Sequence, residues 1–413
     1  MTQVKAPSSE VGKLQSQMGL LQQAANDTRP DTVSSVERRR SPAGDKDGRE
    51  ALERDPPRRS ALAALMFDLP GGSFAFVMAT GIVSIAAMRL GHGEVGAVLF
   101  AVNLISFPLL WVLMLVRLFR HPAAILAELR NHRTGAGFLA AVAATSIVGD
   151  QFVLFASNSN IAAVLWVASL VLWVGLIYTF FVAMTIKPAK PPLAAGLDGT
   201  WLLTVVATQA IAILGTHVAG VFSRLDIVVF ISLCLFLLGG TLYLILISLI
   251  VQRWLFESMR PAQLTPPYWI NMGAAAIATL AGAHLASLAA AAPLTARLAQ
   301  LIEAATVLFW AIATWWIPLL IALLFWRHAM HRVRPVFDLQ YWSMVFPLGM
   351  YAAATWALSR QNGLEFLAVI PRVWVWIALT SWLFGFVGMM RHLSRPHRRG
   401  RRSFGHVDAE TSL

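Results

Sequence analysis

Cysteine is almost missing from this sequence: Cys234 is the one cysteine among 413 residues, and it lies within an apolar run. A single cysteine excludes a disulfide within the chain and a metal site built from cysteines. The hydrophilic segments also lack zinc-ligand spacing, a phosphate-binding glycine loop and a nucleophile motif. We therefore expect no cofactor, no bound metal and no enzymatic activity.

Charged residues are also scarce, at 13% of the chain, whereas an average soluble domain has about 25%. Hydrophobic residues make up 57%, in runs of about 18–24 residues. A helix needs ~20 residues to cross the hydrocarbon core, and only helices or closed barrels satisfy the backbone there. Runs of this length predict an all-α integral membrane protein with ten transmembrane helices. The expected spans are about 73–91, 96–117, 135–153, 161–184, 200–217, 226–250, 269–288, 302–326, 340–357 and 371–390.

The net charge of +12 is concentrated between the apolar runs and in the two tails. This placement indicates contact with anionic membrane lipid, and no nucleic-acid partner is expected. If the N-terminus is inside, the cytoplasmic segments carry 17 lysines and arginines and the outer loops carry 5. The positive-inside rule then predicts a multi-pass protein of the bacterial inner membrane with both termini in the cytoplasm.

Three parts of the chain differ in composition. Residues 1–62 are polar and rich in Ser, Pro, Arg and Asp, which predicts a disordered cytoplasmic tail. Residues 63–393 form the expected ten-helix transport domain. Residues 394–413 form a basic cytoplasmic tail.

Spans one to three and five carry more Gly, Thr and Ser, whereas several even-numbered spans are rich in Leu, Ile, Val and Phe. Small residues suit helix contacts or a wet lumen, and bulky apolar residues suit lipid. We therefore expect inner odd-numbered helices wrapped by outer even-numbered ones. Glycines recur on the odd spans at intervals of 66 to 68 residues, as Gly81, Gly149, Gly215, Gly282 and Gly349. This recurrence fits five helical hairpins around one axis, or chance among 28 glycines.

The polar residues of the odd-numbered spans are mostly neutral. Such groups replace part of an anion's hydration shell without trapping it; alternatively, they simply bond to neighbouring helices. A proton-coupled carrier needs a titratable group within the membrane, and His284 and Asp150 are the two candidates. His284 is either such a proton relay or an interhelical hydrogen-bonding residue. Asp198 fits a helix N-cap. The candidate pore-lining residues are Thr80, Gly81, Ser84, Thr145, Ser146, Gln151, Thr208, Gln209, His284 and Ser343.

The ninth span carries a proline close to its start. Pro347 has no N–H, so the carbonyl of Ser343 loses its helical partner and a bend is expected. A bend there could turn Phe346 towards the axis, where its ring would close a narrow lumen. The alternative for Phe346 is ordinary packing, as for most of the 23 phenylalanines.

Four segments together resemble the tellurite-resistance/dicarboxylate transporter family, which includes slow-type anion channels and fungal malate and sulfite transporters. They are residues 74–84 (FAFVMATGIVS), His121 followed by Pro122, residues 145–151 (TSIVGDQ) and residues 342–348 (WSMVFPL). The resemblance covers about residues 65–395, which leaves the polar N-terminal tail outside it. Gly199, Thr200 and Trp201 match the family only loosely.

The resemblance implies a trimer in which each protomer has its own pore. It implies five helical hairpins in quasi-five-fold order, with the odd-numbered helices inside. It also implies that a phenylalanine of helix nine occludes the pore, and the matching residue is Phe346.

Three functions remain open at this stage. The first is a channel or uniporter for small monovalent anions, gated at Phe346 and Pro347. The second is a proton-coupled carrier of a C4-dicarboxylate such as malate, or an exporter of an oxyanion such as tellurite or sulfite. The third is a scaffold or sensor whose tails bind partners.

Overall fold

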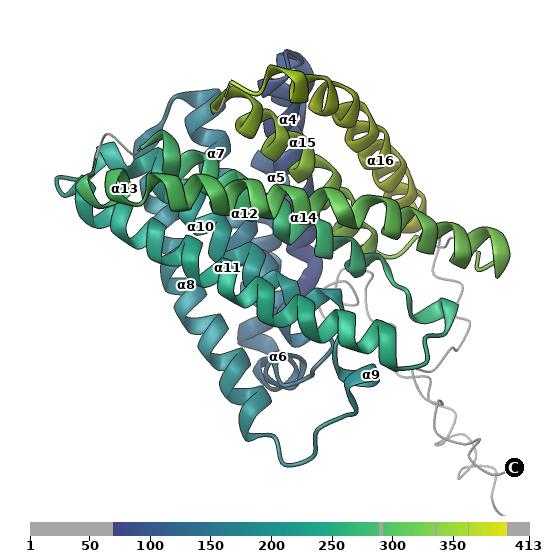
Figure 1. Cartoon of the computed structure of the whole chain (residues 1–413). Helices are drawn as coiled ribbons and strands as arrows, with labels where there is room; N and C mark the ends of the chain where they lie inside the picture. The colour runs from purple at the N-terminus through teal and green to yellow at the C-terminus, as the bar shows by residue number, and fades with distance from the viewer. Residues whose placement is uncertain (1–68, 289–291, 335–336, 362, 395–413) are drawn as a thin grey trace, which may run out of the picture. The chain divides into compact units, whose positions relative to one another are not determined.

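The computed structural model describes residues 69–288, 292–334, 337–361 and 363–394. The predicted tail 1–62 lies outside these residues, as does the predicted tail 394–413 apart from Ser394. Within the described part the regular elements are helices, as expected (Figure 1). The α-helices are α4 (Ala75–Arg89), α5 (Gly93–Arg120), α6 (Pro122–Leu129), α7 (Leu139–Ala156), α8 (Ser159–Ile186), α9 (Leu193–Gly196), α10 (Leu203–Val218), α11 (Leu225–Phe256), α12 (Ile270–Ser287), α13 (Pro293–Arg297), α14 (Ala299–Phe325), α15 (Trp342–Gln361) and α16 (Val369–Ser394).

Nine helical segments among the described residues are long and apolar enough to cross a membrane. The predicted span that is not among these nine is the ninth, which corresponds to α15; this helix has 20 residues but is less apolar. Because most of α15 is buried among other helices, it needs less apolar surface than a helix that faces lipid. The all-α membrane architecture predicted from the sequence is confirmed.

The long helices form two layers. The inner helices α4, α7, α10, α12 and α15 contact one another in that order, and α15 contacts α4, so the ring is closed. Each inner helix packs against the outer helix that follows it: α5, α8, α11, α14 and α16 respectively. The first four inner spans are 78–94% buried and the five outer spans only 17–39%. Odd-numbered spans are therefore inside and even-numbered ones outside, as predicted.

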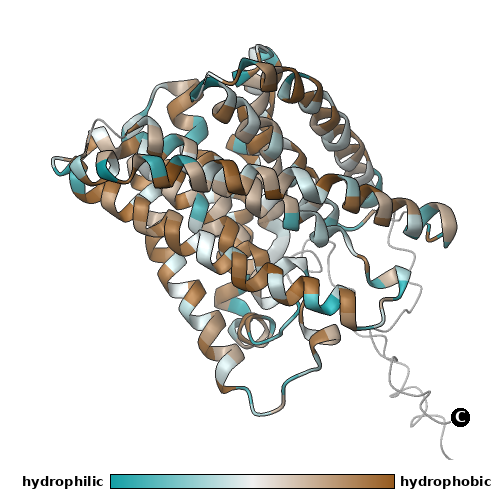
Figure 2. Ribbon diagram, viewed as in Figure 1, coloured by the Kyte–Doolittle hydropathy of each residue, from teal (hydrophilic) through white to brown (hydrophobic). Residues whose placement is uncertain are grey.

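Hydropathy follows the same division. Figure 2 shows hydrophobic residues along the length of α8, α11 and α14, which lie on the outside of the ring. Many of these side chains are exposed, among them Val171, Phe230 and Ile321. Exposed apolar surface on this scale is typical of helices that face the hydrocarbon core.

The five inner helices begin alike. Each follows a short 3₁₀ turn, and these turns are Gly71–Phe74, Gly135–Phe138, Gly199–Leu202, Pro266–Trp269 and Leu339–Tyr341. Asp198 caps the third turn, accepting a bond from the Thr200 N–H at 2.9 Å, which confirms its expected role as an N-cap. Burial raises the pKa of the Asp198 carboxyl.

The five recurring glycines lie at close helix contacts. A Cβ atom added to any of them would come within 2.8 Å or less of a side chain from another helix. Gly149, for example, faces Leu214 of α10, and Gly349 faces Val83 of α4. Gly81, Gly149 and Gly349 face the neighbouring inner helix, whereas Gly215 and Gly282 face side chains of outer helices. At each position the missing side chain lets two helices approach closely.

Two arginines near the ends of outer helices are buried. Arg117 of α5 donates to Glu128 of α6 at 2.8 Å, and Glu128 accepts a further bond from the Gly71 N–H at 2.8 Å. Arg253 of α11 donates to the carbonyl oxygen of Leu197. These bonds join the outer helices to the segments that precede the inner ones.

Candidate functional site

The axis of the inner ring contains a small cavity. Its volume is about 40 Å³, and residues from all five inner helices line it. Such a volume holds on the order of three water molecules. Most of its wall is apolar, formed by residues such as Ile82, Ile147, Ile213, Leu280 and Met350.

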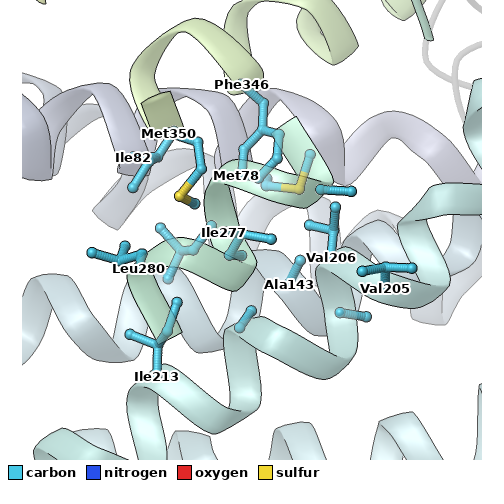
Figure 3. Packing of buried hydrophobic residues seen from close by; sticks show 14 of the residues in the cluster. Met78, Ile82, Ala143, Val205, Val206, Ile213, Ile277, Leu280, Phe346 and Met350 are labelled. Carbon is cyan, nitrogen blue, oxygen red and sulfur yellow. The ribbon is translucent and has the colours of Figure 1, made fainter. Parts of the chain in front are cut away.

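Phe346 lies one helical turn from this cavity, because Met350 lines the wall and follows Phe346 by four residues on α15. The side chain is fully buried. Figure 3 shows its ring beside Met78 of α4, within an apolar cluster that includes Val206 and Ile277 of two further inner helices. The predicted gate residue therefore lies where the inner helices meet.

Pro347 does not interrupt α15, which is helical from Trp342 to Gln361. The ring of Pro347 packs on Gly273 of α12, where an added Cβ would come within 2.7 Å of the proline Cγ. Gly273 thus allows α12 and α15 to approach closely beside Phe346.

Four ionisable residues line the cavity, one from each of four inner helices: Arg89, Asp150, His217 and His284. Asp150 Oδ1 lies 2.7 Å from His217 Nδ1, and the His217 and His284 rings lie 4.5 Å apart, edge to face. Arg89 lies over the ring of Trp356, 5.3 Å from its centroid. We call these four residues the ionisable cluster.

Asp150 and His284 were singled out from the sequence, but His217 was not. A signal for it was present: Gly215 is followed two residues later by His217, and Gly282 is followed two residues later by His284. Equivalent positions in successive hairpins bring the two rings together. Comparing the hairpins with each other would have found the pair.

Two of the three threonines predicted to line the pore bond to outer helices. Thr80 accepts a hydrogen bond from Trp382 of α16 at 2.9 Å, and Thr208 accepts one from Trp173 of α8 at 2.8 Å. The Thr145 hydroxyl donates to the carbonyl oxygen of Ala141 in its own helix.

Four other predicted residues also bond outwards. Ser84 donates to the carbonyl oxygen of Gly96 (2.7 Å), and Ser146 donates to Ser169 Oγ (3.0 Å). Gln151 accepts a bond from Asn103 Nδ2 (2.9 Å), and Gln209 donates to the carbonyl oxygen of Phe236 (3.0 Å). Gly81 faces Ile147 of α7, and Ser343 is buried near the start of α15. Of the ten predicted pore-lining residues, His284 is the one that lines this cavity. A conducting pore lined by the others stays a prediction.

Within the described residues, no three His, Cys, Asp or Glu side chains are grouped so that they could hold a metal ion. The ionisable cluster instead offers two imidazoles, a guanidinium and a carboxylate. Such groups can attract an anion or exchange a proton.

Comparison with known proteins agrees with this architecture. The model of the voltage-dependent anion channel family matches residues 68–390. An uncharacterized membrane protein of Mycobacterium tuberculosis is 43% identical over 162 residues, which are 39% of this chain and 82% of that protein. Two uncharacterized transporters of Methanocaldococcus jannaschii are 24% identical over 321 residues and 22% over 319. Each alignment covers 75% of this chain, and 90% and 89% of the respective relative. The chain therefore belongs to the voltage-dependent anion channel family.

Proposed function

We propose that the chain conducts small monovalent anions along the axis of its five inner helices and that Phe346 closes this path. The observation that carries the proposal is the place of Phe346. It is fully buried at the meeting point of the inner helices, one turn from the axial cavity. An aromatic ring there offers a hydrated ion neither space nor hydrogen bonds.

The preference for anions is supported by the mouth of the cavity. Arg89 is exposed there and carries a fixed positive charge, and the imidazole rings of His217 and His284 lie beside it in the cavity wall. A positive mouth raises the local concentration of anions. Chloride and nitrate suit an apolar path better than divalent ions, because the cost of desolvation rises steeply with charge.

Anion current through the purified protein in planar bilayers tests the proposal. Phe346→Ala is expected to raise the current strongly under chloride and nitrate gradients, with reversal near the anion equilibrium potential. Phe230→Ala, on the lipid-exposed face of α11, is the control and should leave the current unchanged. Because truncation of a buried Phe costs about 3–5 kcal/mol, size-exclusion profiles must show that both variants are folded. Equal currents from folded wild type and folded Phe346→Ala would contradict the proposal that Phe346 closes the path.

A second candidate is a proton-coupled carrier of a C4-dicarboxylate or an oxyanion. The contact of Asp150 with His217, and of His217 with His284, favours it, because coupling needs a titratable group on the transport path. Malate uptake into proteoliposomes should then follow an imposed pH gradient and disappear in His284→Gln. His392→Gln, an exposed histidine at the end of α16, is the matched control. Uptake that ignores the pH gradient would exclude this candidate.

We also propose the orientation and assembly. The end of the bundle that carries Arg117 and Arg253 faces the cytoplasm of a bacterial cell, with both termini on that side, and the ionisable cluster faces outwards. Three protomers assemble, each with its own path. A cysteine placed at Arg360 in a Cys234→Ala background should react with an impermeant maleimide added to intact spheroplasts, and a cysteine at Arg120 should not. The mass of the purified complex checks the trimer.

A further inference from the structure

A second and larger cavity lies away from the axis. Its volume is about 250 Å³, and it is bounded by the segment that leads into α12, the end of α14 and the start of α15. We call it the α14 pocket. It is on the side of the bundle where the outer helices α5, α11 and α14 end, which is also where Arg117 and Arg253 lie.

The wall of the α14 pocket has two chemically different parts. Leu320, Leu323 and Leu324 of α14 form an apolar stretch at helical spacing, and Met344 of α15 adds to it. Leu324 is 37% exposed, so this stretch continues into the outer apolar surface of α14. The apolar part is therefore open to the hydrocarbon that surrounds the outer helices.

The polar part of the pocket is cationic. Arg327 and His328 lie on a π-helical turn, Trp326–Met330, that follows α14. One guanidinium N–H of Arg327 donates to the carbonyl oxygen of Leu264, but its Nε is buried without a hydrogen-bond partner. The Arg327 side chain as a whole is partly exposed, so its other N–H groups can meet an acceptor from outside the chain. Among the described residues, none that lines the pocket is acidic.

The neighbouring residues place the pocket at the depth of lipid headgroups. Trp269 and Tyr341 line it, and aromatic residues of this kind gather at membrane interfaces. Arg332 and Arg334, both exposed, follow the π-helical turn. A ligand for this pocket needs an anionic head with hydrogen-bond acceptors, joined to an apolar chain.

We propose that the α14 pocket binds an anionic phospholipid. The phosphodiester accepts hydrogen bonds from Arg327, for which a planar guanidinium is well suited. One acyl chain follows Leu320 and Leu324 along the outside of α14. The occupied pocket braces the start of α15 and the 3₁₀ turn before it, because Met344 and Tyr341 are part of its wall.

Native mass spectrometry of the full-length protein tests this proposal by counting lipids retained from phosphatidylglycerol and phosphatidylcholine with identical acyl chains. Wild type should retain phosphatidylglycerol about fivefold more strongly, the factor expected of one basic residue at a membrane surface. Arg327→Gln should lose the preference. Arg334→Gln removes the same charge from the same segment outside the pocket and should keep it.

Two further measurements keep the proposal falsifiable if Arg327→Gln does not fold. Leu324→Trp fills the apolar part and should reduce lipid retention without any change of charge. Millimolar inorganic phosphate should not displace the lipid, because the apolar part contributes to binding. Equal retention of both lipids by wild type, or an unchanged preference in folded Arg327→Gln or Leu324→Trp, would overturn the proposal. Displacement of the lipid by phosphate alone would also overturn it. Loss of oligomers in Leu324→Trp with lipid retention intact would overturn it as well, because the pocket would then be a contact between subunits.

Discussion

The inner and outer helices of this protein meet different demands. The outer spans α5, α8, α11 and α14 are more apolar than four of the inner spans, which are far more buried, whereas the fifth outer helix, α16, is no more apolar than α4, α7 or α10. In a soluble protein the most buried helices would be the most apolar. Here lipid takes the place of water, so the greatest hydropathy belongs to the helices that face it. In this bundle burial together with many small residues, rather than hydropathy alone, distinguishes the inner spans.

The inner helices also direct their polar groups in an unexpected way. Thr80 and Thr208 bond to tryptophans of outer helices, while apolar side chains such as Ile82 and Ile277 face the axis. Polar groups within the membrane must find partners, and the interface between the two layers supplies them. The axis is left apolar except at the mouth, where the ionisable cluster lies.

The largest effect is expected when a side chain is added to a closely packed glycine of an inner helix. In Gly215→Leu a Cβ would come within 2.2 Å of Ser232 Oγ and 2.9 Å of Trp166 Nε1. Extra methylenes in a packed interior cost about 1–3 kcal/mol and occasionally more, and a leucine here adds a whole side chain. We expect a loss of monodisperse protein, measured by fluorescence-detected size exclusion after heating.

The matched control is Gly175→Leu on the outer helix α8. An added Cβ at Gly175 meets no atom within 4 Å, so this variant should behave as wild type. Equal losses from the two substitutions would mean that the inner contacts are no tighter than the outer ones.

A smaller effect is expected where an outer helix is tied to the inner layer. Arg117→Met removes the partner of Glu128, whose side chain is 15% exposed. An unpaired, largely buried carboxylate destabilises by about 3 kcal/mol at most, less what solvent recovers at its exposed edge. The midpoint of SDS-induced unfolding should fall. Arg120→Met, three residues later and exposed, should leave it unchanged, and a fall of the same size there would remove the distinction between the two arginines.

Much of this fold could be predicted from the sequence. Helix length, the positions of small residues and the recurrence from Gly81 to Gly349 are linear properties of the chain, and they predicted the ten helices and their two layers. The largest errors are at ends of outer helices: α11 runs to Phe256 rather than 250. Outer helices extend past the hydrocarbon core, where hydropathy no longer marks the boundary.

The direction of side chains within the inner layer could not be predicted. An inner helix such as α7 is buried on all sides, so its sequence has no polar face to show which side meets the axis. Ser146 and Gln151 therefore fitted a lumen as well as an interhelical bond. Only contacts between hairpins decide this, and those contacts also bring His217 to His284 and Asp150.

The smallest predicted effect concerns one bond between the two layers. Trp173 Nε1 of α8 donates to Thr208 Oγ1 of α10 at 2.8 Å, and both side chains are buried. A double-mutant cycle of Trp173→Phe and Thr208→Val, measured by SDS-induced unfolding, should give a coupling energy of about 0.6 kcal/mol, the usual value between membrane helices. The same cycle with Trp310→Phe and Thr355→Val, which form the equivalent bond at 3.0 Å between α14 and α15, should agree. A coupling near zero in both pairs would mean that these bonds orient the side chains without holding the two layers together, and helix packing alone would then account for the inner ring.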